Sequence, residues 1–202
     1  MDGFMTKHVD LAGLIGSRIC HDIISPLGAV GNGVELMQLS GLGQGPEFEL
    51  VRESIEHANA RIKFFRVAFG LASSGQMVQQ TELSSLIQAA KTPRLKIDWP
   101  LSSGLPRLEV KRILLAILAV ERLLVAGGTI SVLSTEPGRW AVRGQGPRIK
   151  DSPVCIDALR HPSADAELEA AEVQFALLRI ECQAYAIAVG ILTGDDFIEL
   201  TV

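Results

Sequence analysis

The stretch "SRICHDIISPLGAVGNG", Ser17 to Gly33, is the segment from which the fold and function of this chain are best inferred. It lies within a longer run, residues 9–40, in which apolar and small residues recur at helical spacing until "SGLGQGP" interrupts them. A second helical run covers residues 46–73 and stops at "ASSGQ". Two helices joined by a short glycine-rich loop predict an antiparallel hairpin.

A lone helical hairpin buries too little surface to be stable by itself, because one side of each helix has no partner. Two copies would cover these sides by forming a four-helix bundle. We therefore expect the chain to form a homodimer through its hairpins.

The pattern changes after about residue 76, where helical runs alternate with strand patterns. Helices are expected at "ELSSLIQAAK", "RLEVKRILLAILAVERLLVA", "PVCIDALRH" and "AELEAAEVQFALLRIECQA". Strands are expected at "RLKIDWP", "TISVLST", "RWAVRGQG" and "AIAVGILTGDDFIELTV", the last turning at "TGDD". The predicted fold class is α+β: a helical hairpin in residues 1–75, then helices on one face of a mostly antiparallel sheet in residues 76–202.

The composition indicates a globular chain with an aliphatic core. Of its 202 residues 48% are hydrophobic and only 5% are aromatic, which favours helices and aliphatic strands. The net charge of −4 argues against a nucleic-acid partner. Two local basic clusters, "RIKFFR" and "RLEVKR", are interpreted as solvated helix faces.

The cysteines and the apolar runs indicate a cytoplasmic protein without a membrane partner. Cys20, Cys155 and Cys182 are far apart and form no CxxC pair, so neither a disulfide framework nor a zinc site is expected. The longest apolar stretch, "ILLAILAVERLLVA", contains two charges and is shorter than the roughly 20 residues that span a bilayer. No signal peptide is recognised at the start.

His21 lies on the small, polar side of the first predicted helix. On a wheel of about 100° per residue, Ser17, Ser25, Gly28 and Asn32 fall within about 40° of it. The larger apolar residues fall roughly opposite; they are Ile19, Ile23, Val30, Val34 and Met37. A core histidine is expected on the apolar side, so this phase favours an exposed imidazole that another protein can approach.

Two neighbours bear on the chemistry and local shape at His21. A neutral imidazole nitrogen is available as a nucleophile near pH 7. Asp22 is a candidate for accepting a proton from the ring or orienting it. Pro26 removes the amide that would bond the carbonyl of Asp22, so we expect the helix to bend or loosen there.

The residues "HDIISPLG" resemble the H-box of dimeric histidine kinases, in which the phosphorylated histidine is followed by an acidic residue and, at the fifth position, by Pro-Leu. The longer stretch "SRICHDIISPLGAVGNGVELM" resembles more closely the ChpT-type histidine phosphotransferases of alphaproteobacteria. The serine four places after the histidine, the Pro-Leu-Gly-Ala that follows it and then "GNGVE" are typical of that family. The order of elements resembles the family over nearly the whole chain.

The resemblance implies a phosphorelay carrier. It would take phosphoryl from the receiver aspartate of a hybrid histidine kinase and pass it to the receiver aspartate of a response regulator. By matching position, His21 is the phosphoacceptor, with Asp22 as its catalytic neighbour and Pro26 in a structural role. The receiver is expected to dock around Ser17, Arg18, Ser25, Gly28 and Asn32. Receivers supply their own Mg²⁺, so this chain is expected to bind none.

The second half is expected to resemble a kinase ATPase domain without its nucleotide site. Kinases need asparagines on the central helix to hold Mg²⁺ and glycine-rich loops to bind phosphates. In "RILLAILAVERLL" the two asparagine positions are Ala116 and Val120, which cannot ligate a metal. In "RGQGPR" no aspartate precedes Gly144 and Gly146, and the end of a strand explains these glycines better. We expect a degenerate domain that binds no ATP.

Two alternatives remain open from the sequence: an active dimeric histidine kinase with an atypical ATP site, and a dimeric adaptor without catalysis. A metal site is not expected, because no two histidines of the chain have i, i+4 spacing. His57 is interpreted as a solvated residue of the second helix, and His161 as a loop residue.

Overall fold

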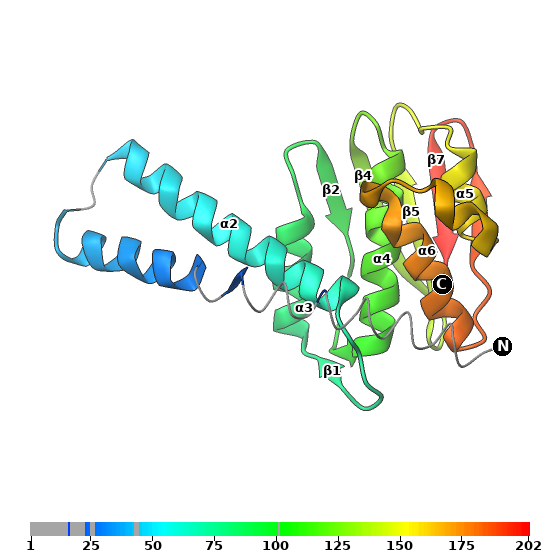
Figure 1. The fold of residues 1–202 in the computed structure, drawn as a ribbon, viewed down its shortest axis with the longest axis horizontal. Coiled ribbons are helices and arrows are strands. Elements are labelled where there is room, and N and C mark those ends of the chain that lie inside the picture. Colours follow the sequence, from blue (N-terminus) through cyan, green and yellow to red (C-terminus); the bar gives the residue numbers. More distant parts are fainter. Residues whose placement is uncertain (1–15, 17–22, 25–26, 43–44, 101) are drawn as a thin grey trace.

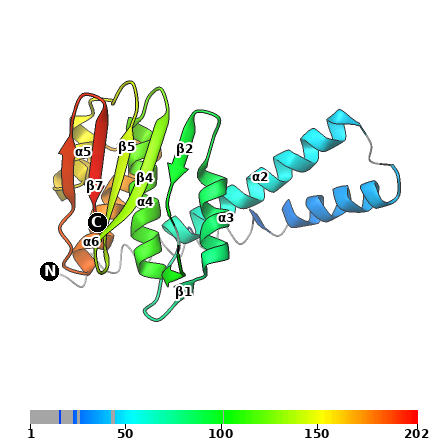
Figure 2. The same cartoon turned by 180° about the vertical axis from the view of Figure 1, so that it is seen from behind.

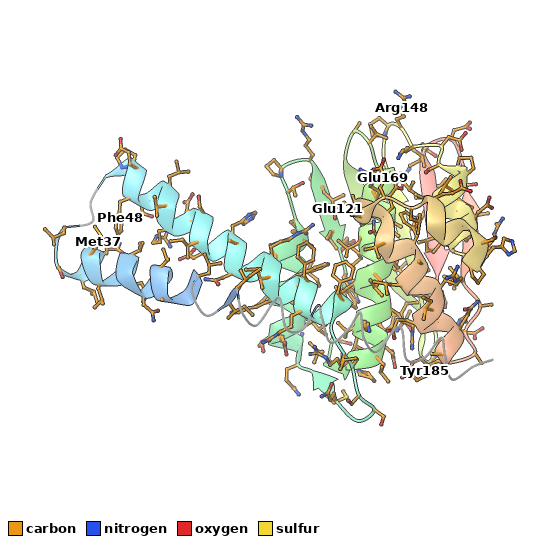
Figure 3. All side chains as sticks on the ribbon, viewed as in Figure 1. Met37, Phe48, Glu121, Arg148, Glu169 and Tyr185 are labelled. Carbon is orange, nitrogen blue, oxygen red and sulfur yellow. The ribbon has the colours of Figure 1, made fainter. Side chains whose placement is uncertain are left out.

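A computed structural model of the chain describes residues 16, 23–24, 27–42, 45–100 and 102–202. A first helix, residues 27–39, is followed by a loop and by α2 (Pro46–Phe69). The two helices lie antiparallel and project from the rest of the chain (Figure 1). Figure 3 shows Met37 and Phe48 between them, and the position of a Cβ on Gly31 lies 3.4 Å from Ile55. The predicted hairpin is confirmed over these residues.

The sheet has five strands in the order β2-β4-β5-β7-β6. They are β2 (Leu95–Asp98), β4 (Gly128–Glu136), β5 (Arg139–Gln145), β7 (Phe197–Thr201) and β6 (Gly190–Thr193). Only the β2–β4 pair is parallel, so the sheet is mostly antiparallel, as predicted. A separate two-stranded ribbon pairs β1 (Met77–Val78) with β3 (Leu105–Pro106), and the sequence patterns did not predict it.

Helices cover one face of the sheet and leave the other face open (Figures 1 and 2). They are α3 (Gln80–Ala90), α4 (Arg107–Leu123), α5 (Pro153–Ala158) and α6 (Val173–Ala184). Burial alternates along the strands: Ile130 and Val132 of β4 are buried, whereas Thr129 and Leu133 are exposed. This period of two is expected when only one face of a sheet is packed. The α+β fold class is thus confirmed.

Helix α4 forms the centre of the core. Every residue from 110 to 120 is buried, and α4 contacts α2, α6 and the sheet. The last turns of α2 belong to the same hydrophobic cluster, through Phe64, Val67 and Ala68. The predicted boundary at residues 75 and 76 falls in the connection between α2 and β1. The α+β domain (residues 76–202) is therefore packed directly on the end of the hairpin.

One interpretation of the basic clusters is wrong. Lys111 and Arg112 of "RLEVKR" are buried, not solvated. Lys111 forms an ion pair with Glu181, and the guanidinium of Arg112 lies 5.5 Å from the ring centroid of Tyr185, which Figure 3 labels. Because α4 is buried on all sides, these cations are accommodated within the protein rather than in water. In "RIKFFR", Lys63 is exposed as predicted.

Helix α6 begins later than its pattern predicted. The expected helix covered residues 166–184, but α6 starts at Val173, after two 3₁₀ helices, η1 (Pro162–Glu167) and η2 (Ala170–Glu172). The capping box formed by Glu169 and Glu172 holds the second of these turns. Local hydrogen bonding of this kind competes with a continuous α-helix.

The two described cysteines lie in the interior of the domain. Cys155 and Cys182 are free and buried, and burial raises the pKa of Cys182 to about 12, so its reactive thiolate form is suppressed. Cys20 lies outside the described residues. In the described part of the chain, no helix combines the length and the apolar character needed to cross a membrane.

The packing of β5 on α4 gives a testable prediction. A Cβ at Gly144 would overlap Val120 Cγ1 and lie 3.1 Å from Leu124 Cδ1. We expect Gly144→Ala to lower the free energy of unfolding by about 1–3 kcal/mol, the usual cost of overpacking, in urea denaturation. Gly33→Ala is the matched control: nothing lies within 4 Å of its Cβ position, and alanine favours a helix by up to about 1 kcal/mol. Equal stability of Gly144→Ala and wild type would contradict this packing.

Candidate functional site

Most of the predicted site lies outside the described residues, so those assignments stay predictions. The residues concerned are Ser17, Arg18, His21, Asp22, Ser25 and Pro26. Gly28 and Asn32 are described, and both lie in the first helix. Asn32 is exposed, and no atom lies within 4 Å of the position a Cβ would take on Gly28. The side of the helix that carries these two residues is therefore open to an approaching partner.

The first helix contacts α2 through Val34, at one flank of its apolar stripe, and through Gly31 beside it. Val34 is buried, and Gly31 packs near Ile55. On the wheel this contact side lies about 80–140° from His21. The stripe roughly opposite His21 is largely exposed: Ile23 by 45%, Val30 by 53% and Met37 by 47%. In a single chain the stripe is therefore covered in part, at Val34, and its other described residues stay about half exposed.

Aromatic rings and one ion pair join α2 to the α+β domain. Phe65 and Phe69 of α2 pack against the core of the domain and against each other, with their ring centroids 5.7 Å apart and their planes tilted by 47°. The guanidinium of Arg61 lies 4.8 Å from the ring centroid of Phe65 and 3.7 Å from a carboxylate oxygen of Glu121 on α4. Burial raises the pKa of Glu121, and Arg61 opposes that rise. Desolvation is the larger of the two effects, so the pKa of Glu121 lies above its ordinary value, and Arg61 limits how far it rises.

A groove of about 790 Å³ opens beside this ion pair, between α2, α4 and residues 170–174. Its apolar lining comes from Phe65, Phe69, Leu118, Leu124, Val125, Ala170, Ala171 and Val173. Its polar lining comes from Arg61, Glu121, Arg122, Lys150 and Gln174. Figure 3 shows Glu121 and Glu169 at the same end of the domain. The groove has walls from both halves of the chain.

Glu172 fastens the segment between β5 and α6 to the end of α4. Its carboxylate accepts hydrogen bonds from Arg122 Nη2 at 3.1 Å and from Lys150 Nζ at 3.3 Å. The backbone of the same segment is bound as well, because Lys150 N donates to Leu123 O at 2.7 Å. Desolvation raises the pKa of Glu172, but the hydrogen bonds from Arg122, from the Glu169 amide and from Lys150 outweigh it, so the pKa lies below its ordinary value.

Ala116 and Val120, where the sequence comparison looked for the two asparagines of a kinase, lie in the core of the domain. Ala116 and Val120 are fully buried, and Val120 packs against Gly144 of β5. A Cβ at Gly146 would overlap the carbonyl oxygen of Gly127. Both glycines of "RGQG" are therefore explained by close packing at the end of a strand. In the described residues, no cluster of three or more acidic, histidine or cysteine side chains is arranged to hold a metal ion.

Sequence reasoning missed the groove. It treated the charges of α2 and α4 as solvated faces or as interruptions of an apolar run. The available signal was the dipeptide Glu121-Arg122 within an otherwise apolar helix. Its two charges find partners on different elements, Arg61 for Glu121 and Glu172 for Arg122. His57 and His161 are exposed, as predicted.

Comparison with known proteins identifies the family. The family described as "Histidine phosphotransferase C-terminal domain" matches residues 81–197. This chain belongs to that family. A curated relative, protein phosphotransferase ChpT of Brucella abortus (strain 2308), is 29% identical over 199 residues, 94% of each chain. The solved structure of a bacterial phosphotransferase, 23% identical, matches with a TM-score of 0.61 over 95% of each chain.

These matches confirm the resemblance on which the functional expectation rests. The chain is a histidine phosphotransferase by family, and the structural match extends over both the hairpin and the α+β domain. The family match itself covers the domain alone. The family match therefore does not include His21, the predicted phosphoacceptor.

The Glu172 cluster predicts a pH-dependent stability of this histidine phosphotransferase. Removing the shared acceptor with Glu172→Gln should lower the free energy of unfolding at pH 7 by about 1–3 kcal/mol. The unfolded glutamate has a pKa of about 4.3, and the folded pKa is lower. The contribution of Glu172 to the free energy of unfolding is therefore complete above the pKa of the unfolded state, and it is lost as the pH falls through the pKa of the folded state.

Urea unfolding of wild type and Glu172→Gln between pH 3 and 7 measures this difference, which should shrink below about pH 4. Glu136→Gln, at the exposed end of β4, is the control and should follow wild type throughout. A difference between wild type and Glu172→Gln that does not change with pH would refute the assignment.

Proposed function

We propose that this chain shuttles phosphoryl groups through His21. It takes them from the receiver aspartate of a hybrid histidine kinase and delivers them to the receiver aspartate of a response regulator. The observation that carries the proposal is the order of parts: a hairpin bearing "HDIISPLG" precedes a histidine phosphotransferase domain at residues 81–197. The open side of the first helix at Gly28 and Asn32 gives a partner room to approach.

The chemical step needs little from this chain. A ring nitrogen of neutral His21 attacks the phosphorus of the receiver's aspartyl phosphate. The P–N bond forms, the P–O bond to the carboxyl breaks, and the electron pair leaves with the carboxylate. The second ring nitrogen keeps its proton, and Asp22 balances the positive charge of the phosphorylated ring. The reverse sequence loads the next receiver.

The remaining predicted residues form the docking surface in this proposal. Ser17, Ser25, Gly28 and Asn32 keep the approach to His21 free of bulk, because each is small or short. Arg18 offers a guanidinium to the phosphoryl oxygens or to acidic receiver loops. Pro26 loosens the helix one turn beyond the histidine. The Mg²⁺ stays in the receiver, and the exchange takes place in the cytoplasm.

We propose further that the α+β domain binds no ATP and acts as scaffold and docking surface. The buried Ala116 and Val120 leave no metal ligands at the two asparagine positions. The packing of Gly144 on Val120 and of Gly146 on Gly127 occupies the space near the strand end. These contacts weigh against an active kinase. The adaptor alternative differs from the proposal only in that His21 would accept no phosphoryl group.

A variant of His21 tests the proposal. His21→Gln should abolish phosphoryl acceptance from a phosphorylated receiver, because no other group stands at the H-box position, while the far-ultraviolet circular dichroism stays unchanged. His57→Gln, which removes an exposed histidine of α2, is the matched control and should accept phosphoryl at the wild-type rate. Radiolabel transferred from the receiver and resolved on gels gives the measurement. Labelling of His21→Gln at the wild-type rate would refute His21 as the phosphoacceptor, whereas a wild type that accepts no label would favour the adaptor.

We also propose that the hairpins pair into a homodimeric four-helix bundle. The stripe with Ile23, Val30 and Met37 is exposed in the single chain, and α2 adds exposed Leu50 and Val51. Contiguous exposed apolar surface on a helical pair marks an interface, because leaving it in water costs free energy. A second copy supplies the same apolar surface in return.

Two exposed apolar residues, one inside the proposed interface and one outside it, test the dimer. Val30 in the hairpin stripe is 53% exposed and Leu192 in β6 is 55% exposed. Wild type should scatter light as twice the 21.7 kDa monomer. Val30→Glu should shift the mass toward the monomer, because it places two charges in the apolar bundle interface. Leu192→Glu should remain dimeric. A monomeric wild type, or a dimer that tolerates Val30→Glu, would exclude this interface.

A further inference from the structure

Helix α2 is anchored in the α+β domain at its C-terminal end only. Phe64, Val67 and Ala68 are almost fully buried in the core. At the same end Arg107 of α4 donates hydrogen bonds to the carbonyl oxygens of Arg66 and Leu71, both at 3.4 Å. Toward the hairpin tip the helix leaves the domain (Figure 1). The C-terminal part of α2 is therefore held by the domain, whereas its N-terminal part projects from it.

Hollows lie on both sides of α2 beside this anchor. The 790 Å³ groove lies on the side of α4 and residues 170–174. Two smaller hollows, of about 580 and 310 Å³, lie between α2 and α3 and share Glu56, Ala60 and Ser85 in their linings. Where α2 borders the larger groove at Arg61, its side chains make fewer dispersion contacts than in a fully packed core, so a small change of tilt about the anchor is opposed less strongly there.

The ion pair between Arg61 and Glu121 lies at the edge of the larger groove. Among the described residues it is the one ion pair that links α2 to α4. The two side chains are 33% and 28% exposed, so the pair is only partly screened by water. The guanidinium is also held above the rings of Phe64 and Phe65, which restricts the directions it can take.

This pair lies on α2 between the levels at which two described glycines of the N-terminal segment approach the helix. The Cβ position of Gly16 lies 3.6 Å from Phe69, and that of Gly31 lies 3.4 Å from Ile55. Arg61 falls between these two levels of α2. The sequence between Gly16 and Gly31 contains His21.

From this arrangement we infer that the Arg61–Glu121 ion pair is a latch. It holds the hairpin at one angle to the α+β domain, and both residues are positioning residues for phosphoryl transfer at His21. The inference rests on the proposed function. Partly exposed pairs add little to folding stability, so the latch acts on orientation, where it shifts the balance of angles roughly two- to fivefold.

Orientation matters because the receiver meets two surfaces at once. The reacting atoms must come within about 3–3.5 Å of each other. If the receiver rests on the domain while its aspartate reaches the hairpin, any rocking of α2 misplaces one contact relative to the other. A broken latch therefore reduces productive encounters and leaves the imidazole itself unchanged.

Charge reversal tests the latch. Arg61→Glu and Glu121→Arg should each slow transfer from a phosphorylated receiver by roughly two- to tenfold, because like charges then oppose each other. The double variant Arg61→Glu/Glu121→Arg restores the pair and should return the rate to within about twofold of wild type. Phosphorylation by phosphoramidate, a small donor that does not dock, should be the same in all variants.

Arg52→Glu is the matched control. Arg52 also lies on α2 and is 32% exposed, but its partners Glu49 and Glu56 belong to the same helix. It should transfer at the wild-type rate. Single reversals that transfer as fast as wild type overturn the latch. So does a double variant that stays slow, because the two residues would then act on the receiver and not on each other.

Amide hydrogen exchange in residues 53–63 gives a readout independent of phosphotransfer. The single reversals should raise exchange there, because a rocking helix opens more often, and the double variant should reverse the rise. Unchanged exchange in the single reversals overturns the latch. A wild-type chain that accepts phosphoryl from neither donor overturns the proposed function instead.

Discussion

The burial of α4 on every side is the constraint on which the rest of the structure depends. Residues 110–120 have no solvent-facing member, so each must fit a neighbour on the sheet, α2 or α6. On the sheet side this fit requires glycine at position 144, since Val120 takes the space of a Cβ. Ala116 and Val120 belong to this buried run, so their small and branched apolar side chains serve the packing of the core.

The same constraint explains why charges on α4 have fixed partners. Lys111 pairs with Glu181 inside the domain, and Arg122 reaches Glu172 at the other end of the helix. Such groups must be paired, because an uncompensated charge in a core costs several kcal/mol. Pairing them ties α4 to α6 and to the segment before it. These ion pairs therefore fix the orientation of α6 and of the segment before it relative to α4 more closely than apolar packing alone would.

The apolar repeat in the sequence predicted most elements of this fold, because an element that packs one face against the core carries apolar residues at regular spacing. The strands β2, β4, β5, β6 and β7 and the helices α3, α4 and α5 were all expected near their observed positions. The ribbon of β1 and β3 was missed because two-residue strands have no period. The burial of Arg112 was missed because a cation above Tyr185 leaves no sequence pattern. Gly28 and Asn32 are the part of the predicted site that the structure describes, and their open surroundings agree with the wheel.

The residues of the first helix differ in size and exposure around its circumference. Val34 and Gly31 face α2, where close approach needs a small residue between larger ones. Val30 belongs to an apolar stripe that the single chain leaves partly in water. Gly28 and Asn32 form a side without bulk. Within the single chain, α2 covers the apolar stripe at Val34 but leaves Val30 half exposed. The proposed second copy would cover this remaining apolar surface, and the side with Gly28 and Asn32 stays open in the single chain.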